Sequence, residues 1–172
     1  MNKAGQPHPL VVLARLAIVS HLSGDPPPST EIPGDPAGAA GAFVSLKKAG
    51  QLRGCIGTIS PVQPDVAREV LENAVSAATK DPRFPPVTLD EVDDITISVD
   101  VLGAPEPVSG LEELDPQRYG VIVKCGLRKG LLLPDLPGIT TAEEQVRIAR
   151  LKAGIGTEEV VELFRFEVER YT

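Results

Sequence analysis

Apolar residues recur with helical spacing in three stretches of the chain, and this spacing predicts three helices. The expected ranges are about residues 8–22, 65–79 and 141–153. The second range carries a stripe of Val, Leu and Ala residues that is expected to be buried. Thr141 followed by Glu144 matches a capping box, which marks the start of the third helix.

Between these stretches apolar and polar residues alternate, which predicts strands. The expected strands are residues 42–48, 52–59, 94–102, 119–125, 129–133 and 163–171. Short turns separate the first two strands, and the fourth from the fifth, so each of these pairs is predicted to form a hairpin. Hairpins that dominate over alternating strands and helices favour an α+β fold with a mixed, mostly antiparallel sheet and flanking helices.

The length of 172 residues is typical of one domain, so residues 1–172 are expected to form a single domain. Residues 23–42 are rich in Pro, Gly, Ala and Ser. A stretch of this composition has little means of burying itself, which predicts an exposed loop. The alternative is a lid that folds over a cleft.

Charge and hydropathy narrow the classes of function. The net charge is −7 and the chain has no basic block, which argues against nucleic-acid binding because that depends on Lys and Arg at phosphates. The apolar run at residues 10–18 contains Arg15 and is too short for a membrane span. No secretory signal pattern precedes it. Cys55 and Cys125 lie far apart in sequence and are interpreted as reduced thiols of a cytoplasmic protein.

The segment Arg53-Gly54-Cys55-Ile56-Gly57 is the first candidate site. Strand alternation places the side chains of Arg53 and Cys55 on the same face, and a nearby guanidinium favours the reactive thiolate. Gly54 and Gly57 would let a ligand or another backbone approach closely. The alternative is structural, since cysteine often packs as a small buried residue.

Asp81 and Arg83 form a second candidate pair. Arg83 could present its guanidinium to a carboxylate or phosphate, and Asp81 could orient it or act as a base. Asp81 is considered as a base because the two histidines, His8 and His21, lie at the ends of the first predicted helix, away from Cys55 in sequence. The alternative is that this segment only ends the second helix.

The basic hairpin turn that contains Arg128 is a further candidate for anion binding, through its backbone N–H groups and cations. The alternative is a solvated loop. No Cys-x-x-Cys or His-x-x-x-His spacing occurs, so no autonomous metal site is predicted. The lone Gly154-Ile155-Gly156 does not follow a predicted strand, so it is weak as a nucleotide motif, and no cofactor is expected.

The chain resembles the AMMECR-one domain family, whose prokaryotic members are named AmmeMemoRadiSam system protein A. The signature-like segment is Leu52–Thr58, and the likeness covers nearly the whole chain. Four further segments are similar to family motifs: residues 13–18, 73–74 with 81–84, 130–134 and 152–155. Many members have a Cys shortly before the last of these, where this chain reads Ile148-Ala149-Arg150-Leu151.

The resemblance implies two unequal parts with the Arg-Gly-Cys segment at a cleft, and it implies a Memo-like protein and a radical-SAM protein as partners. Three hypotheses follow. The first is a binding component that recognises a small anionic ligand, a peptide or these partners. The second is a thiol-dependent enzyme that uses Cys55 with Arg53, Asp81 and Arg83. The third is a motif with a purely structural role.

Overall fold

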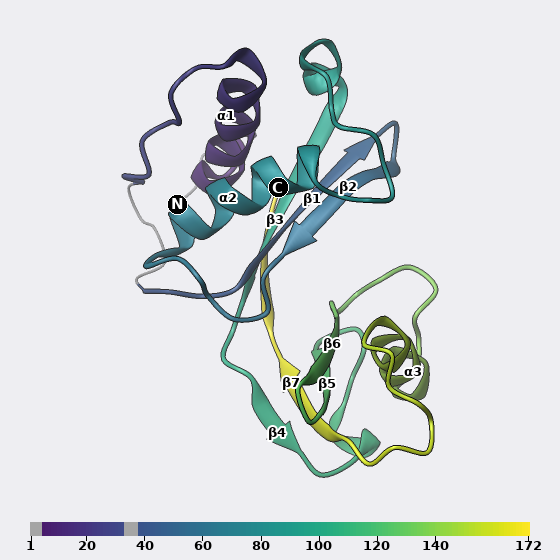
Figure 1. Cartoon of the computed structure of the whole chain (residues 1–172). Helices are drawn as coiled ribbons and strands as arrows, with labels where there is room; N and C mark the ends of the chain where they lie inside the picture. The colour runs from purple at the N-terminus through teal and green to yellow at the C-terminus, as the bar shows by residue number, and fades with distance from the viewer. Residues whose placement is uncertain (1–4, 33–37) are drawn as a thin grey trace. The chain divides into compact units, whose positions relative to one another are not determined.

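The chain is described here by a computed structural model, which covers residues 5–32 and 38–172. Its internal contacts divide it into two compact units. Unit 1 comprises the chain up to Val101 together with the C-terminal residues Glu169–Thr172, and unit 2 consists of Leu102–Val168. Figure 1 shows the chain coloured along its length, with the yellow C-terminal segment carrying strands of both units.

Unit 1 is built on a four-stranded sheet in the order β2-β1-β3-β8. Strand β1 pairs antiparallel with both β2 and β3. The elements of this unit are α1 (Pro9–Ser23), β1 (Ala42–Lys48), β2 (Gln51–Gly57), α2 (Val66–Thr79), the 3-10 helix η1 (Leu89–Asp94), β3 (Ile95–Leu102) and β8 (Val168–Tyr171).

The two long helices of unit 1 share one hydrophobic core with the sheet. Helix α2 packs on β1 and β2, and α1 packs on α2 and η1. Alternation along β1 places Ala42, Val44 and Leu46 in this core. The His8 side chain caps α1 by accepting from the Leu10 N–H, and Gly24 ends that helix in the left-handed conformation.

Unit 2 has a four-stranded sheet in the order β4-β7-β5-β6, in which the paired strands are antiparallel. Helix α3 packs on β5 and β6. It approaches closely at Gly130, where an added Cβ would lie 1.9 Å from the Ala149 carbonyl oxygen. The elements are β4 (Glu106–Val108), the 3-10 helix η2 (Leu111–Glu113), β5 (Gly120–Cys125), β6 (Arg128–Leu132), α3 (Ala142–Lys152) and β7 (Glu162–Phe166).

The α+β fold and the three long helices are confirmed, and the strand positions agree closely for five of the six expected strands. The exception is residues 163–171, expected as one strand. They form two strands, β7 and β8, separated at Glu167, and each belongs to a different sheet. The short strand β4 was not predicted. The cleft implied by the resemblance stays a prediction.

The predicted loop at residues 23–42 lies partly outside the described residues, since 33–37 are not described. Residues 24–32 and 38–41 contain neither helix nor strand. Ile32 and Ala40 are nevertheless half-buried and pack against the core of unit 1. The described part of this loop is therefore anchored at two apolar residues. The role of a lid stays a prediction.

Candidate functional site

Strand β2 forms an edge of the unit 1 sheet, and Cys55 lies in its middle. Cys55 is opposite Ser45 of β1, but its N–H donates to Asp81 Oδ2 at 2.9 Å. Its carbonyl oxygen accepts from Arg83 Nη2 at 3.4 Å. The two side chains therefore occupy main-chain groups that an edge strand would otherwise offer to another strand.

Asp81 is the centre of this arrangement. Its carboxylate also accepts from the N–H of Arg83 at 3.1 Å, from Arg83 Nε at 3.0 Å and from Arg83 Nη2 at 2.7 Å. The residue is only 5% exposed. The hydrogen bond from Arg83, with a smaller contribution from the Cys55 N–H, holds the pKa of Asp81 well below its usual range, although burial opposes this shift. Asp81 therefore remains ionised and serves as an acceptor for Arg83.

Arg83 combines a fixed position with access to solvent. Asp81 and the Cys55 carbonyl occupy Nε and Nη2, while Nη1 donates no hydrogen bond to any residue in the described part of the chain. The side chain is 55% exposed. Hydrogen bonding to Asp81 raises the pKa of Arg83, and Coulombic attraction to Asp81 and then to Cys55 adds to this. A permanent cation thus lies close enough to attract a thiolate at Cys55.

Cys55 is half-buried and forms no disulfide with Cys125. Its Sγ lies 3.2 Å from the Ser45 hydroxyl oxygen on the neighbouring strand. Residues 45 and 55 form a pair whose side chains share a face, as strand pairing requires. The hydroxyl and the thiol can each act as donor or acceptor in this contact.

Arg53 is bound by residues of the 85–91 segment. Its guanidinium donates from Nε and Nη2 to the Glu91 carboxylate, at 3.3 Å and 2.6 Å, and to the carbonyls of Pro85 and Pro86. The side chain is only 15% exposed. The hydrogen bond from Arg53, assisted by Lys48 and against the effect of burial, lowers the pKa of Glu91 to about 2. These contacts attach the 85–91 segment to β2. A ligand role for Arg53 stays a prediction.

The two glycines of the segment have packing partners. A Cβ at Gly54 would lie 2.3 Å from the Ala77 carbonyl oxygen of α2. A Cβ at Gly57 would lie 2.2 Å from the ring of Phe43, which is its partner across the strands. Both positions need glycine for close approach. At Gly54 this approach is by another backbone, one of the two possibilities that the sequence left open.

The last predicted site residue, Arg128, belongs to unit 2. It forms an ion pair with Glu159 and donates from Nη1 to the Gly154 carbonyl at 2.7 Å. Cys125 Sγ lies 3.6 Å from Arg128 Nη2 and 3.7 Å from Glu159 Oε1. Hydrogen bonding from Arg128 lowers the pKa of Glu159 to about 2. Arg128 therefore joins a turn to the 154–159 loop, and its anion-binding role stays a prediction.

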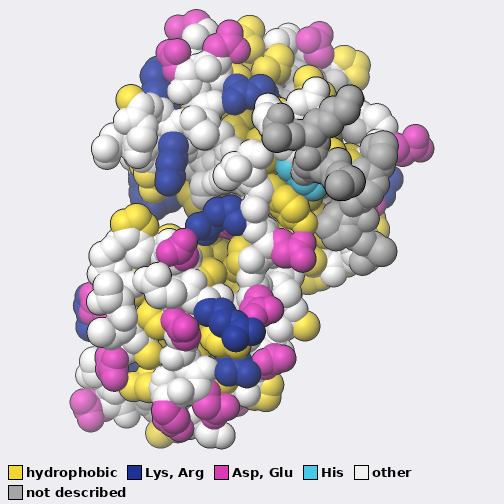
Figure 2. Space-filling model, turned by 180° about the vertical axis from the view of Figure 1, so that it is seen from behind, with side chains coloured by type: hydrophobic (Ala, Val, Ile, Leu, Met, Phe, Trp, Pro, Cys, Tyr) yellow, Lys and Arg dark blue, Asp and Glu magenta, His cyan; other side chains and the backbone are white. Residues whose placement is uncertain are grey.

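The described residues carry both signs of charge on their surface. Among them, no group of three or more His, Cys, Asp or Glu residues could hold a metal ion. Figure 2 shows Lys and Arg side chains interspersed with Asp and Glu on the visible face, without a continuous basic patch. Within residues 5–32 and 38–172, no helix has the length and apolar character needed to cross a membrane.

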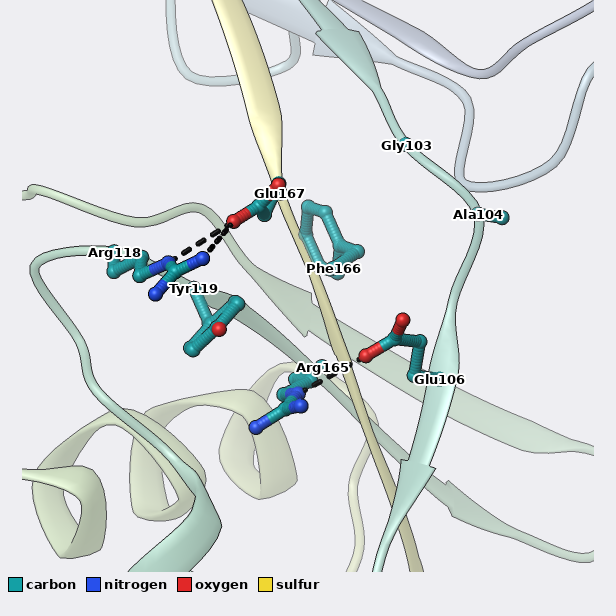
Figure 3. A pocket seen from close by; sticks show the side chains of 8 residues that line it. All are labelled: Gly103, Ala104, Glu106, Arg118, Tyr119, Arg165, Phe166 and Glu167. Carbon is teal, nitrogen blue, oxygen red and sulfur yellow. Dashed lines mark hydrogen bonds and ion pairs between the residues drawn. The ribbon is translucent and has the colours of Figure 1, made fainter.

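A pocket in unit 2 was not predicted from the sequence. It has a volume of about 430 Å³ and is lined by Gly103, Ala104, Glu106, Arg118, Tyr119, Arg165, Phe166 and Glu167 (Figure 3). The polar lining comes from three separate segments of the chain. Only the pairing of β4 with β7 brings Glu106 opposite Arg165, so a local sequence pattern carries no signal for this pocket.

Cys55, Asp81 and Arg83 form one site, called here the β2 site. The fold and this site define an α+β protein with a half-buried thiol at a sheet edge that Asp81 and Arg83 cover. The chain belongs to the AMMECR1 family, whose model matches residues 11–171. A Thermotoga maritima protein is 60% identical over 134 residues, which cover 77% of both chains.

Two further relatives extend the comparison. A Clostridium acetobutylicum protein is 54% identical over 131 residues, which cover 76% of this chain and 28% of that protein. The crystal structure of an uncharacterized protein from Pyrococcus horikoshii has a TM-score of 0.83 and 33% sequence identity, and the match covers 94% of this chain and 88% of that one. The chain therefore spans less than a third of the Clostridium relative.

Proposed function

We propose that this protein is a binding component of an AmmeMemoRadiSam-type system, and that Arg83 beside Cys55 receives an anionic group of a small ligand or a partner protein. One observation carries the proposal: Arg83 is held by Asp81 and by the Cys55 main chain, yet 55% of its side chain is exposed and Nη1 is unoccupied by the described residues. A guanidinium fixed in this way loses little conformational entropy on binding a carboxylate or phosphate.

Arg83 is also the proposed contact for a partner protein. The candidates are a Memo-like protein and a radical-SAM protein, which the family resemblance implies. The match to 28% of the longer Clostridium protein is consistent with a domain that functions next to other protein segments. A carboxylate on such a partner would contact Arg83 Nη1, and its neighbouring atoms would lie beside the Cys55 thiol.

The thiol-dependent enzyme is less well supported by the contacts. A general base must reach the proton that it removes. Asp81 instead directs both oxygens to Arg83 and to the Cys55 N–H, and its low pKa makes it a weak base. The catalytic roles of Cys55 and Asp81 stay predictions. The purely structural hypothesis accounts for Gly54, Gly57 and Arg53 but gives no reason for the exposed half of Arg83.

Binding to the purified Memo-like and radical-SAM proteins from the same genome tests the proposal. Arg83→Ala should weaken binding to at least one of them about tenfold, the loss of one charge-assisted hydrogen bond. Arg83→Lys should also weaken it, because a point charge does not replace a planar fork. Arg68→Ala is the matched control, since Arg68 is 52% exposed and also pairs with an aspartate of the same unit.

A second measurement addresses the charge at the site directly. Cys55 is alkylated with iodoacetate, which is anionic, and with iodoacetamide, which is neutral, and the modified peptide is quantified separately from that of Cys125. Arg83→Gln should lower the ratio of the iodoacetate rate to the iodoacetamide rate at Cys55, because the cation that attracts the anionic reagent is removed. The same ratio at Cys125 should not change. Unchanged partner binding by Arg83→Ala together with an unchanged rate ratio would reject the proposal.

A further inference from the structure

The charges that line the pocket of unit 2 are balanced. Its lining holds two guanidinium groups and two carboxylates, joined as two ion pairs. Arg118 contacts Glu167 at 2.9 Å, and Arg165 contacts Glu106 at 3.2 Å. The net charge of the lining is therefore zero. A ligand with a large net charge would be repelled by as many groups of the lining as attract it: an anion by the two carboxylates, a cation by the two guanidinium groups.

Tyr119 separates the two cations. Figure 3 shows its ring between the guanidinium groups of Arg118 and Arg165, whose central carbons lie 4.8 Å and 4.6 Å from the ring centroid. Cation–π attraction holds both groups in place. A nucleobase cannot stack on a ring that is already covered in this way. A single phosphate-sized anion would contact one guanidinium and not both.

Each ion pair leaves hydrogen-bonding capacity unused. Within the described residues, Arg118 donates from Nε to Oε1 of Glu167, and Nη2 forms an ion pair with the same oxygen. Arg165 donates from Nε to Oε2 of Glu106 and from Nη1 to the Glu113 carbonyl. Among contacts of the described residues, Arg118 Nη1 and Arg165 Nη2 donate no hydrogen bond, and Oε2 of Glu167 and Oε1 of Glu106 accept none. The pocket thus offers charged donors and charged acceptors together.

These groups are accessible, and their supports are fixed. The side chains of Arg118, Glu167 and Glu106 are 64%, 60% and 65% exposed, so a ligand reaches them without opening the core. The buried Phe166 lies at the wall of the pocket. The N–H of Gly103 donates to the Glu167 carbonyl at 2.9 Å, which fixes the backbone at the pocket.

We infer that this pocket binds a small zwitterion, which carries an ammonium group and a carboxylate in one molecule. The ammonium group donates to a free carboxylate oxygen of Glu106 or Glu167, and the carboxylate accepts from a free N–H of Arg118 or Arg165. Such a ligand keeps the pocket neutral and opens neither ion pair. A volume of about 430 Å³ lies within the usual range for small-molecule sites. Free amino acids and short peptides share this chemistry.

NMR titration of the full-length protein tests the inference, with the amides of Gly103, Ala104 and Tyr119 as reporters. The probes are glycine, L-leucine and the dipeptide glycylglycine, each titrated to about 20 mM because a few charged contacts correspond to about millimolar affinity. N-acetylglycine lacks the ammonium group and glycinamide lacks the carboxylate. At least one zwitterion should shift the reporters in a saturable way, and the two blocked compounds should not. Tighter binding of glycine or L-leucine would indicate a free amino acid as the ligand, and tighter binding of glycylglycine would indicate a short peptide.

Matched variants locate the site. Arg118→Gln and Glu106→Gln should each weaken zwitterion binding about tenfold, the loss expected for one hydrogen bond to a charged group. Arg147→Gln is the control, because Arg147 forms a similarly exposed ion pair with Glu144 on α3 and does not line the pocket. The inference is overturned if no zwitterion shifts the reporters, if a blocked compound shifts them equally, or if the control weakens binding as much. It is independent of the function proposed for Arg83.

Discussion

Replacing Glu91 with Gln tests whether Arg53 attaches the 85–91 segment to the sheet. The Glu91 carboxylate accepts from Arg53, Lys48 and the Thr88 N–H, and its side chain is 13% exposed. Gln keeps the shape and removes the charge. Arg53, at 15% exposure, would then be a cation in a largely buried position with only carbonyl partners.

The lowered pKa of Glu91 gives the size of the expected loss in the free energy of unfolding. Its pKa is lowered from 4.5 to about 2, and one pKa unit corresponds to about 1.4 kcal/mol, so the charge contributes at most about 3.4 kcal/mol to the free energy of unfolding at neutral pH. Lys48 is 40% exposed, so solvent screens part of this interaction and a loss of about 2 kcal/mol is expected.

The sign of the pH dependence follows from a lowered pKa in the folded state. The stabilisation is complete above the unfolded value of 4.5 and is lost as the pH falls toward about 2. Protonated Glu resembles Gln in shape and charge. The difference between wild type and Glu91→Gln should therefore be about 2 kcal/mol at pH 7 and should shrink steadily below about pH 4.5.

Urea denaturation measures this difference, followed through the NMR cross-peaks of Val44 and Leu46 so that unit 1 is observed separately. Asp94→Asn is the control, because Asp94 lies on the same 3-10 helix, 4.0 Å from the same Lys48, but is 70% exposed. It should change the free energy of unfolding by less than about 0.5 kcal/mol. A Glu91→Gln difference that stays constant from pH 7 to about pH 2.5 would refute the reasoning.

Two further substitutions test the packing of unit 1 by thermal or urea denaturation. Gly54→Ala places a Cβ against the Ala77 carbonyl and should lower the free energy of unfolding by about 3 kcal/mol. The control is Gly156→Ala, whose Cβ would have its nearest contact at 3.4 Å and which should lower it by less than about 0.5 kcal/mol. Equal effects of the two substitutions would contradict the close approach at Gly54. Arg170→Ala removes both hydrogen bonds to the buried Asp100 carboxylate and should cost about 2 kcal/mol, while unchanged stability would show that the pair contributes nothing.

The sequence predicted those parts of the fold that depend on short-range patterns. Helical spacing and strand alternation located α2, β1 and β3 to within one or two residues, because the apolar residues of each recur with the period of the element. The shared face of Arg53 and Cys55 stays a prediction, because the pairing of β1 with β2 shifts register at Arg53, between Gly54 and Leu52. The sequence pattern did not predict that residues 163–171 divide into two strands. Apolar and polar residues continue to alternate through Glu167, although the chain passes there from one sheet to the other.

The partners of the site residues depend on contacts distant in sequence. Arg53 bonds to Glu91, 38 residues later, and Cys55 bonds to Asp81, 26 residues later. Nothing in the local pattern of 52–58 distinguishes an arginine that binds a ligand from one that binds a buried glutamate. Asp81 and Arg83 were selected for their chemistry, and the structure adds that they act together on the Cys55 main chain.

The division of residues 162–171 between two sheets has a consequence for synthesis on the ribosome. Strand β8 completes the sheet of unit 1 beside β3, but all of unit 2 is translated between them. At about 5–20 residues per second, the nascent chain carries an unpaired β3 edge for several seconds. During that interval the growing polypeptide depends on its helices or on a chaperone to keep the edge from pairing with other chains.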